Sequence, residues 1–145
     1  MMEALKCVLY VSKAKMVFSQ TDLDRLAEVS TKNNEELDIT GYLFYEKNYF
    51  LQYMEGPPKS INNMIHKIAL DDRHELICII EDEDLQIRRF PNWGMKNIGE
   101  LMLKNSAIET TIIQTMSLFG ENQLKLSQST QTELFKLMDY LSHSV

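Results

Sequence analysis

The order of hydrophobic patterns over residues 4–90 constrains the fold of this chain more than any other feature. Apolar, β-branched runs at 4–11 and 75–82 are typical of buried strands. Between them, residues 38–55 contain two aromatic-rich runs separated by the polar residues 46–48. A short polar interruption between two such runs predicts a β-hairpin.

A capping pattern begins the first predicted helix. Ser19 is followed three residues later by Asp22, a spacing that lets the two residues satisfy each other's backbone N–H groups. The residues that would share one helical face are Leu23, Leu26, Ala27 and Ser30. We expect this helix to end near Asn33 and Asn34, because asparagine suits helix ends better than helix interiors.

The second predicted helix begins at Pro57 and Pro58, since proline is tolerated in a first helical turn. Apolar residues then follow with helical spacing, at Ile61, Met64, Ile65 and Ile68. One more β element is expected at 85–90, after an acidic turn at 83–84. The order βαββαββ predicts an α+β, ferredoxin-like fold, in which an antiparallel sheet carries two helices on one face.

Two further amphipathic helices are expected at 106–119 and 129–142. Each begins with a capping-box pattern, and a glycine that could stop the helix ends the first; the residues are Ser106 with Glu109, Thr130 with Glu133, and Gly120. Their apolar stripes need a partner, which is either the open face of the sheet or another subunit. We therefore divide the chain into an α+β domain, 1–97, and a helical extension, 98–145, that packs on the sheet or forms an oligomer interface.

Composition excludes several classes of protein. The 145-residue chain has a formal net charge of −6, which argues against direct nucleic-acid binding. No apolar run approaches the roughly 20 residues needed to span a bilayer, and the N-terminus lacks the pattern of a signal peptide. Cys7 and Cys78 lie in aliphatic runs without metal-ligand spacing, so we expect reduced, buried thiols, with a cross-strand disulfide as the alternative. These features predict a cytoplasmic protein without membrane contact.

The familiar signatures of catalysis are missing from the sequence. The three histidines are scattered without ligand spacing, which argues against a metal site. The five glycines form neither a dinucleotide-binding motif nor a P-loop, and no serine lies in a nucleophile elbow. We therefore expect a protein that is not an enzyme.

Two polar residues lie within otherwise apolar strands. Tyr10 ends an aliphatic run and Gln52 interrupts an aromatic one. A buried hydroxyl or amide needs a hydrogen-bond partner. Each has an ordinary alternative, as a strand tyrosine at the surface or an exposed strand glutamine. Together with Asn33 and Asn34, which could simply end a helix, they suggest neutral donors and acceptors for a planar heteroaromatic ligand.

The sequence resembles the BLUF family of flavin-dependent blue-light sensors. The similarity covers residues 5–97 and rests on several blocks in order: LKCVLYVS, STKNN, ITGYLFYEKNYFLQYMEGP, IHKIALDDRH and FPNWGM. The resemblance implies a flavin cofactor, most often FAD, with FMN or riboflavin as alternatives. It also implies the short, stand-alone type of BLUF protein.

The resemblance implies roles for six residues around the flavin ring. Tyr10 would be the redox-active tyrosine, and Gln52 the amide that changes its hydrogen bonds between the phenol and the flavin. An amide can do this without backbone movement, since it has a donor end and an acceptor end. Asn33 and Asn34 would hold the carbonyl edge of the ring. Leu26 and Ile68 would sandwich it from the two helices.

Three charged residues match the family's ribityl and phosphate region. They are Lys67, Asp71 and Arg73. Lys67 stands where the family often has an arginine. Its ammonium group keeps the positive charge but cannot give the two parallel hydrogen bonds of a guanidinium. Asp71 and Arg73 could alternatively be an ordinary surface helix end.

Trp93 and Met95 match the family segment proposed to exchange positions when the glutamine switches. The alternative is that Trp93 is an ordinary core residue. Gly94 between them is compatible with a mobile edge strand.

The resulting hypothesis is a blue-light photoreceptor. Light would drive transient electron and proton transfer from Tyr10 to the flavin, rearrange Gln52 and produce a red-shifted state. The segment with Trp93 and Met95 and the C-terminal helices would pass this change to a partner protein, and a homo-oligomer is expected. The alternatives are a cofactor-free interaction module of ferredoxin-like fold and a flavin redox enzyme.

Overall fold

Four antiparallel strands form one sheet in the order β2-β3-β1-β4. The structure is a computed structural model and describes residues 4–91 and 107–144. The elements, in chain order, are β1 (Leu5–Ala14), α1 (Gln20–Glu36), β2 (Thr40–Glu46), β3 (Tyr49–Gly56), α2 (Pro58–Ala69), β4 (His74–Leu85), α4 (Ala107–Glu121) and α5 (Gln128–Ser144).

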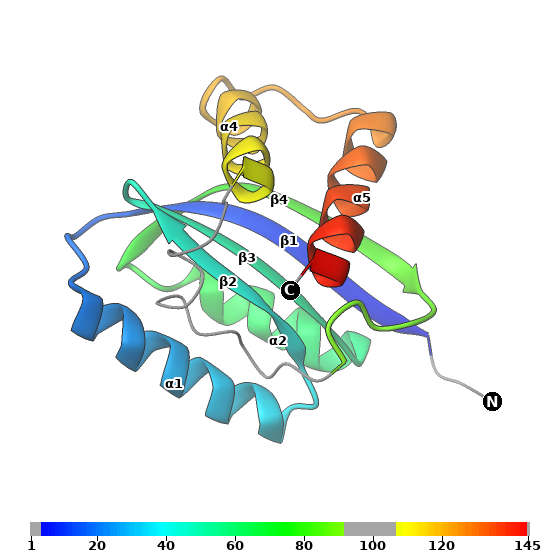
Figure 1. Cartoon of the computed structure of the whole chain (residues 1–145), viewed down its shortest axis with the longest axis horizontal. Coiled ribbons are helices and arrows are strands. Elements are labelled where there is room, and N and C mark those ends of the chain that lie inside the picture. The colour runs from blue at the N-terminus through cyan, green and yellow to red at the C-terminus, as the bar shows by residue number, and fades with distance from the viewer. Residues whose placement is uncertain (1–3, 92–106, 145) are drawn as a thin grey trace.

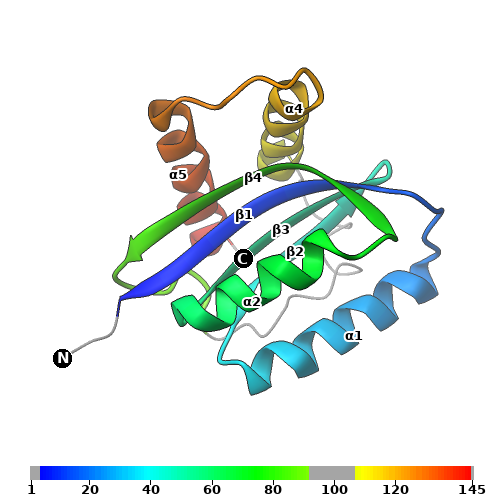
Figure 2. The same ribbon diagram turned by 180° about the vertical axis from the view of Figure 1, so that it is seen from behind.

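Helices cover both faces of the sheet. Helices α1 and α2 lie on one face, and α4 and α5 lie on the other (Figures 1 and 2). This arrangement confirms the predicted α+β, ferredoxin-like fold with two additional C-terminal helices. In the structure the extension packs on the open sheet face, one of the two partners that its apolar stripes could have taken. The division of the chain at residue 97 stays a prediction.

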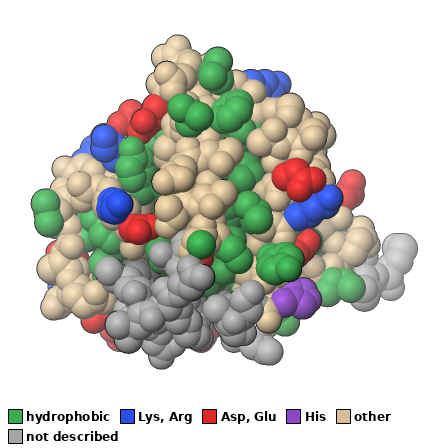
Figure 3. All heavy atoms as spheres, turned by 45° about the horizontal axis from the view of Figure 1, so that its top comes forward, with side chains coloured by type: hydrophobic (Ala, Val, Ile, Leu, Met, Phe, Trp, Pro, Cys, Tyr) green, Lys and Arg blue, Asp and Glu red, His purple; other side chains and the backbone are tan. Residues whose placement is uncertain are grey.

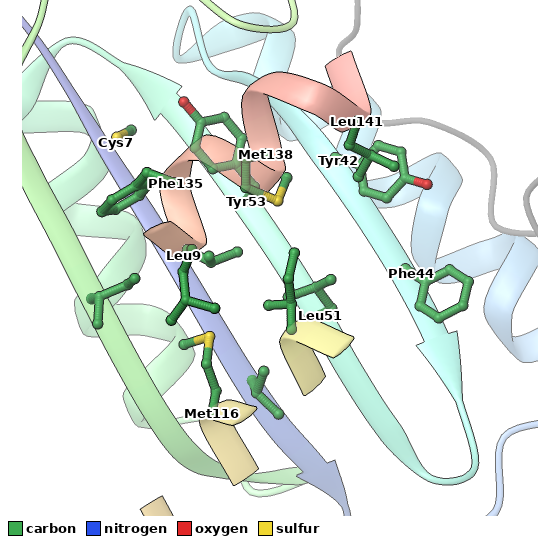
Figure 4. Packing of buried hydrophobic residues seen from close by; sticks show 14 of the residues in the cluster. Cys7, Leu9, Tyr42, Phe44, Leu51, Tyr53, Met116, Phe135, Met138 and Leu141 are labelled. Carbon is green, nitrogen blue, oxygen red and sulfur yellow. The ribbon is translucent and has the colours of Figure 1, made fainter. Parts of the chain in front are cut away.

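The central strand β1 is buried on both faces, so its side chains supply two cores. Leu9 and Val11 belong to the core beneath α4 and α5, and Val8 and Tyr10 to the core facing α1 and α2. Figure 4 shows side chains of β1, β2 and β3 meeting those of α4 and α5 in the first core. Such alternation is what strand geometry imposes. It separates the candidate ligand face from the face that the extension covers.

Both cysteines are free thiols, as expected. Cys7 is buried, and burial raises the pKa of its thiol to about 11. Cys78 is partly buried and lies opposite Val11, not Cys7, in the register of β1 and β4.

The predicted hairpin is confirmed. Strands β2 and β3 pair with Glu46 opposite Tyr49, which leaves Lys47 and Asn48 as a two-residue turn. Both have positive φ, 50° and 71°. This is the conformation of the tight hairpin turns whose twist matches that of the strands.

The predicted strand over 85–90 is wrong within the described residues. β4 itself continues through the expected acidic turn to Leu85, and the chain then leaves the sheet. The buried carboxylate of Glu55 accepts hydrogen bonds from the backbone N–H groups of Arg89 and Phe90, at 2.7 and 2.8 Å. A side chain therefore satisfies backbone groups that a neighbouring strand would otherwise bind.

Side chains cap the helices, although one predicted cap is displaced. The Ser19–Asp22 capping box is present, and α1 continues past its predicted end to Glu36. In α5 the predicted cap Thr130 is wrong, because Ser127 Oγ accepts the backbone N–H of Thr130 at 3.1 Å. The expected cap of α4, Ser106, lies outside the described residues.

Gly120 does not end a helix as predicted but lies inside α4, close to β4. A Cβ at this position would lie 2.2 Å from the backbone oxygen of Ile77. The glycine therefore permits the helix to approach the sheet.

Apolar side chains remain on the outer surface of the extension. Leu118, Leu124 and Tyr140 are exposed, and Figure 3 shows hydrophobic side chains gathered on the α4–α5 side of the molecule. No helix in the described parts of the chain is long and apolar enough to cross a membrane.

Replacing Gly120 with alanine should destabilise the protein by about 1–3 kcal/mol, because the new methyl group must push α4 away from β4. Helix propensity alone would predict a gain of about 1 kcal/mol, so the sign of the change is diagnostic. Urea unfolding measures it. The control Ser129→Ala, at an exposed position of α5, should change the free energy of unfolding by less than about 0.5 kcal/mol; a stabilised Gly120→Ala would contradict the close approach.

Candidate functional site

A cavity of about 490 Å³ lies between the sheet and helices α1 and α2. Residues of all four strands and of both helices line it, as do the loops before and after α1 and the loop after α2. They are Tyr10, Met16, Phe18, Asp22, Arg25, Leu26, Val29, Ser30, Asn33, Leu37, Leu43, Phe50, Gln52, Met64, Lys67, Ile68, Asp71, Arg73 and His74.

Tyr10 and Gln52 form the polar centre of the cavity. They are direct partners in the register of β1 and β3, so their side chains project from the same sheet face. The Tyr10 hydroxyl donates a hydrogen bond to Gln52 Oε1. Only 4% of Tyr10 and 6% of Gln52 is exposed. Burial raises the pKa of the Tyr10 phenol, so the phenol keeps its proton at neutral pH.

Apolar side chains form two opposing walls. Leu26 projects from α1 and Ile68 from α2, and each is partly buried against the sheet core. Phe50 of β3 contributes an aromatic ring from the sheet side. A slot of this kind favours a flat, apolar ligand with polar edges.

The two asparagines differ in position. Asn33 lines the cavity. Asn34 is completely buried and is not among the lining residues; its backbone oxygen accepts the N–H groups of Leu37 and Ile39, at 3.2 and 2.8 Å. The structure therefore brings Asn33, but not Asn34, to the cavity with Tyr10 and Gln52.

Charged residues gather where α2 ends. Lys67, Asp71 and Arg73 all line the cavity. Arg73 Nη2 lies 2.6 Å from Asp71 Oδ2 and the Arg73 Nε donates to Oδ1 at 3.0 Å. Hydrogen bonds from Arg73 lower the pKa of Asp71 to about 2. His74 stays neutral at pH 7, since burial lowers the pKa of its imidazole.

Sequence reasoning missed several lining residues. Arg25, Val29 and Ser30 share the cavity face of α1 with Leu26 and Asn33. Helical periodicity from Leu26 could have found Val29 and Ser30, because residues three and four apart share a face. Nothing in the sequence alone distinguished Arg25 from an ordinary surface arginine.

The two residues predicted for the mobile segment, Trp93 and Met95, lie outside the described residues. In the described parts of the chain, no group of three or more His, Cys, Asp or Glu side chains could hold a metal ion.

Comparison with known proteins identifies the class of this site. Residues 5–96 match the family described as "BLUF: Sensors of blue-light using FAD". The photoactivated adenylate cyclase subunit beta of Euglena longa is 33% identical over 100 residues, which are 68% of this chain and 12% of that protein. The chain thus spans a small fraction of the curated relatives that it matches.

Solved structures show the same fold. A bacterial light-regulated adenylyl cyclase superposes with a TM-score of 0.67 at 32% identity, over 81% of this chain and 36% of that one. The dark-state structure of BlrB, a BLUF protein, superposes with a TM-score of 0.69 at 22% identity and full coverage of both chains. The chain belongs to the BLUF family of blue-light sensors, and flavin is the cofactor of that family.

The cavity fits a flavin. Its volume lies within the range of about 300–1,000 Å³ that is typical of small-molecule sites. Leu26 and Ile68 supply apolar walls for a planar ring, while Gln52 and Asn33 supply amide groups for its polar edge.

The pH dependence of the Asp71–Arg73 pair can be measured directly. The carboxyl of Asp71 should titrate near pH 2 in NMR, and Arg73→Gln should return its pKa toward the usual value of about 4. Because the folded-state pKa is lowered, the pair stabilises the protein above about pH 4, and this contribution is lost as the pH falls toward 2. An unchanged Asp71 titration in Arg73→Gln would contradict the assigned cause.

Proposed function

We propose that the chain is a blue-light photoreceptor in which Tyr10 and Gln52 convert light absorption into a change of hydrogen bonding. Bound flavin supplies the light absorption and, once excited, the electron-accepting group. With flavin bound, Tyr10 would supply this electron and then its hydroxyl proton, and would recover both before the signalling state is complete. The hydrogen bond from the Tyr10 hydroxyl to Gln52 Oε1 carries this proposal.

Gln52 retains the change in hydrogen bonding after the electron and proton have returned to Tyr10. With Oε1 accepting from Tyr10, the Nε2 group is directed away from the phenol. Rotation of the amide, or its tautomerisation, replaces an acceptor facing Tyr10 with a donor. The backbone stays in place, because β3 is paired on both sides, with β1 and with β2. With flavin bound, the altered hydrogen bonds of Gln52 would shift the absorption slightly to the red.

The altered state is passed on through the opposite sheet face. Tyr53 follows Gln52 in β3 but points toward α5, where its hydroxyl accepts a hydrogen bond from Arg89 at 2.9 Å. Arg89 also pairs with Asp139 of α5 and lies over the Phe135 ring. These contacts support a route from β3 to the C-terminal helices, beside the route proposed through Trp93 and Met95.

The receiver is a protein. The exposed apolar residues Leu118, Leu124 and Tyr140 of the extension provide a surface for a downstream signalling protein or for a second copy in a homo-oligomer. The chain acts by contact and not by catalysis. A light-dependent change in affinity for such a partner would complete the signalling function.

Replacing Gln52 with leucine should abolish the light-induced red shift while flavin remains bound, because leucine fills a similar space without an amide. Difference absorption spectra under blue light test this. The matched control Gln114→Leu, on the exposed side of α4, should keep the wild-type shift. A normal shift in Gln52→Leu would exclude the proposed switch.

Replacing Tyr10 with phenylalanine removes the hydroxyl and with it the proton that moves. Flavin binding should persist, since Tyr10 contributes one hydrogen bond and Phe retains the ring. The red-shifted state should not form, which transient absorption can follow from picoseconds onward. A Tyr10→Phe protein that photoswitches normally would show that another residue is the donor.

A further inference from the structure

His74 is a titratable residue of the cavity to which the proposed photochemistry gives no role. It is the first residue of β4, is partly buried and lines the cavity. Its ring lies beside the phenol of Tyr10, with 6.3 Å between the ring centroids and 54° between the ring planes. Because Tyr10 is almost completely buried, a charge on the imidazole would act on the phenol with little screening by solvent.

One hydrogen bond fixes the orientation of the imidazole. His74 Nε2 lies 3.2 Å from the backbone oxygen of Ile68. A carbonyl oxygen can only accept, so Nε2 carries the hydrogen. Among the residues that the structure describes, none is hydrogen-bonded to Nδ1. Protonation of Nδ1 would therefore add a positive charge without breaking the contact that holds the ring.

Charged groups of the neighbouring loops act on the imidazole in opposite directions. Burial lowers its pKa, the Asp71 carboxylate raises it, and the cations of Arg73 and Lys15 lower it. The backbone N–H of Lys15 donates to the oxygen of Arg73 at 2.9 Å, so the loops before α1 and after α2 meet near His74. The other charged residues that line the cavity, from α1 and α2, are Asp22, Arg25 and Lys67.

Three close neighbours of His74 keep their charge states over the pH range in which an imidazole titrates. Hydrogen bonds from Arg73 lower the pKa of Asp71 to about 2, and the same pairing raises the pKa of Arg73. Burial, and after it the charge of Asp71, raise the pKa of the Tyr10 phenol. His74 is therefore the member of this group whose charge changes near neutral pH.

We infer that His74 controls, through its own protonation, how readily Tyr10 gives up an electron. The inference rests on the proposed function and adds a pH dependence to it. With flavin bound, Tyr10 would lose one electron and then its hydroxyl proton to the excited flavin and recover both, while His74 exchanges neither. The phenol is positive after the electron leaves and before the proton follows. A neutral imidazole leaves this charge unopposed, whereas an imidazolium beside the phenol opposes it.

The yield of the red-shifted state as a function of pH tests this inference in the flavin-bound full chain. The yield should be constant above about pH 7 and fall at least about threefold by about pH 5, as His74 takes up a proton. NMR titration of the His74 imidazole, with and without flavin, is an independent measurement, and its midpoint in the flavin-bound chain should coincide with that of the yield. A constant yield over a pH range in which His74 titrates, or no protonation of His74 above about pH 5, would overturn the inference.

Replacing His74 with glutamine keeps a donor for the Ile68 oxygen but removes the titratable ring. The yield of His74→Gln should be independent of pH and equal to that of the wild type at neutral pH. The matched control His66→Gln removes an exposed imidazole of α2 that does not line the cavity, and it should keep the wild-type pH profile. An unchanged fall at acid pH in His74→Gln would overturn the role of His74.

Two charge changes provide a test that does not depend on the folding of His74→Gln. Asp71→Asn should move the midpoint of both the NMR titration and the yield to lower pH, and Lys15→Gln should move it to higher pH, because these residues raise and lower the pKa of His74. Midpoints of the yield that do not follow those of His74 would contradict the inference. If the wild-type chain formed no red-shifted state at any pH, the proposed function itself would fail; a red shift with a flat pH profile would preserve that function and overturn only the role of His74.

Discussion

The register between β1 and β3 is the constraint on which the site depends. It places Tyr10 directly opposite Gln52, and β1 is buried on both faces. A slip of one residue would move one of these side chains to the face covered by α4 and α5. The same slip would bring Leu9 or Val11 out of its core. Packing of two hydrophobic layers therefore holds a hydrogen bond between two polar side chains in place.

A second polar group, Glu55, fixes the end of the same strand. It is fully buried, and its carboxylate accepts hydrogen bonds from Thr40, Tyr53, and the backbone of Arg89 and Phe90. A buried carboxylate is tolerated when its oxygens are satisfied in this way. Glu55 thus ties β2 and β3 to the segment after β4, three residues beyond Gln52.

Local signals in the sequence were sufficient for most of the fold. The Ser19–Asp22 box, Pro58 in the first turn of α2 and the polar interruption at 46–48 each act through neighbouring residues, so each could be recognised. The strand expected at 85–90 failed because the group that prevents it, Glu55, lies more than 30 residues earlier. The prediction that Gly120 ends a helix was wrong for a similar reason, since the backbone that requires a glycine there is that of Ile77, which is also distant in the sequence.

The functional site was predictable to the same extent: features visible in the local sequence were found, and features set by distant residues were missed. Tyr10 and Gln52 were noticeable as polar residues within apolar strands, and the family resemblance suggested their roles. Arg25 could not be singled out, because only the packing of α1 against the sheet brings it to the cavity. Asn34 is fully buried near the end of α1, and its backbone oxygen closes the turn into β2; its contact with the flavin stays a prediction.

The tight turn at Lys47 and Asn48 also has a consequence for the order of folding. A hairpin closed by two residues forms in about 1–10 μs, so β2 and β3 can pair early. Pairing of β1 with β3 must close a loop of some 40 residues, which is slower. We therefore expect the strand that carries Gln52, β3, to be in place before the strand that carries Tyr10, β1. The cavity would be complete only when β1 joins the sheet.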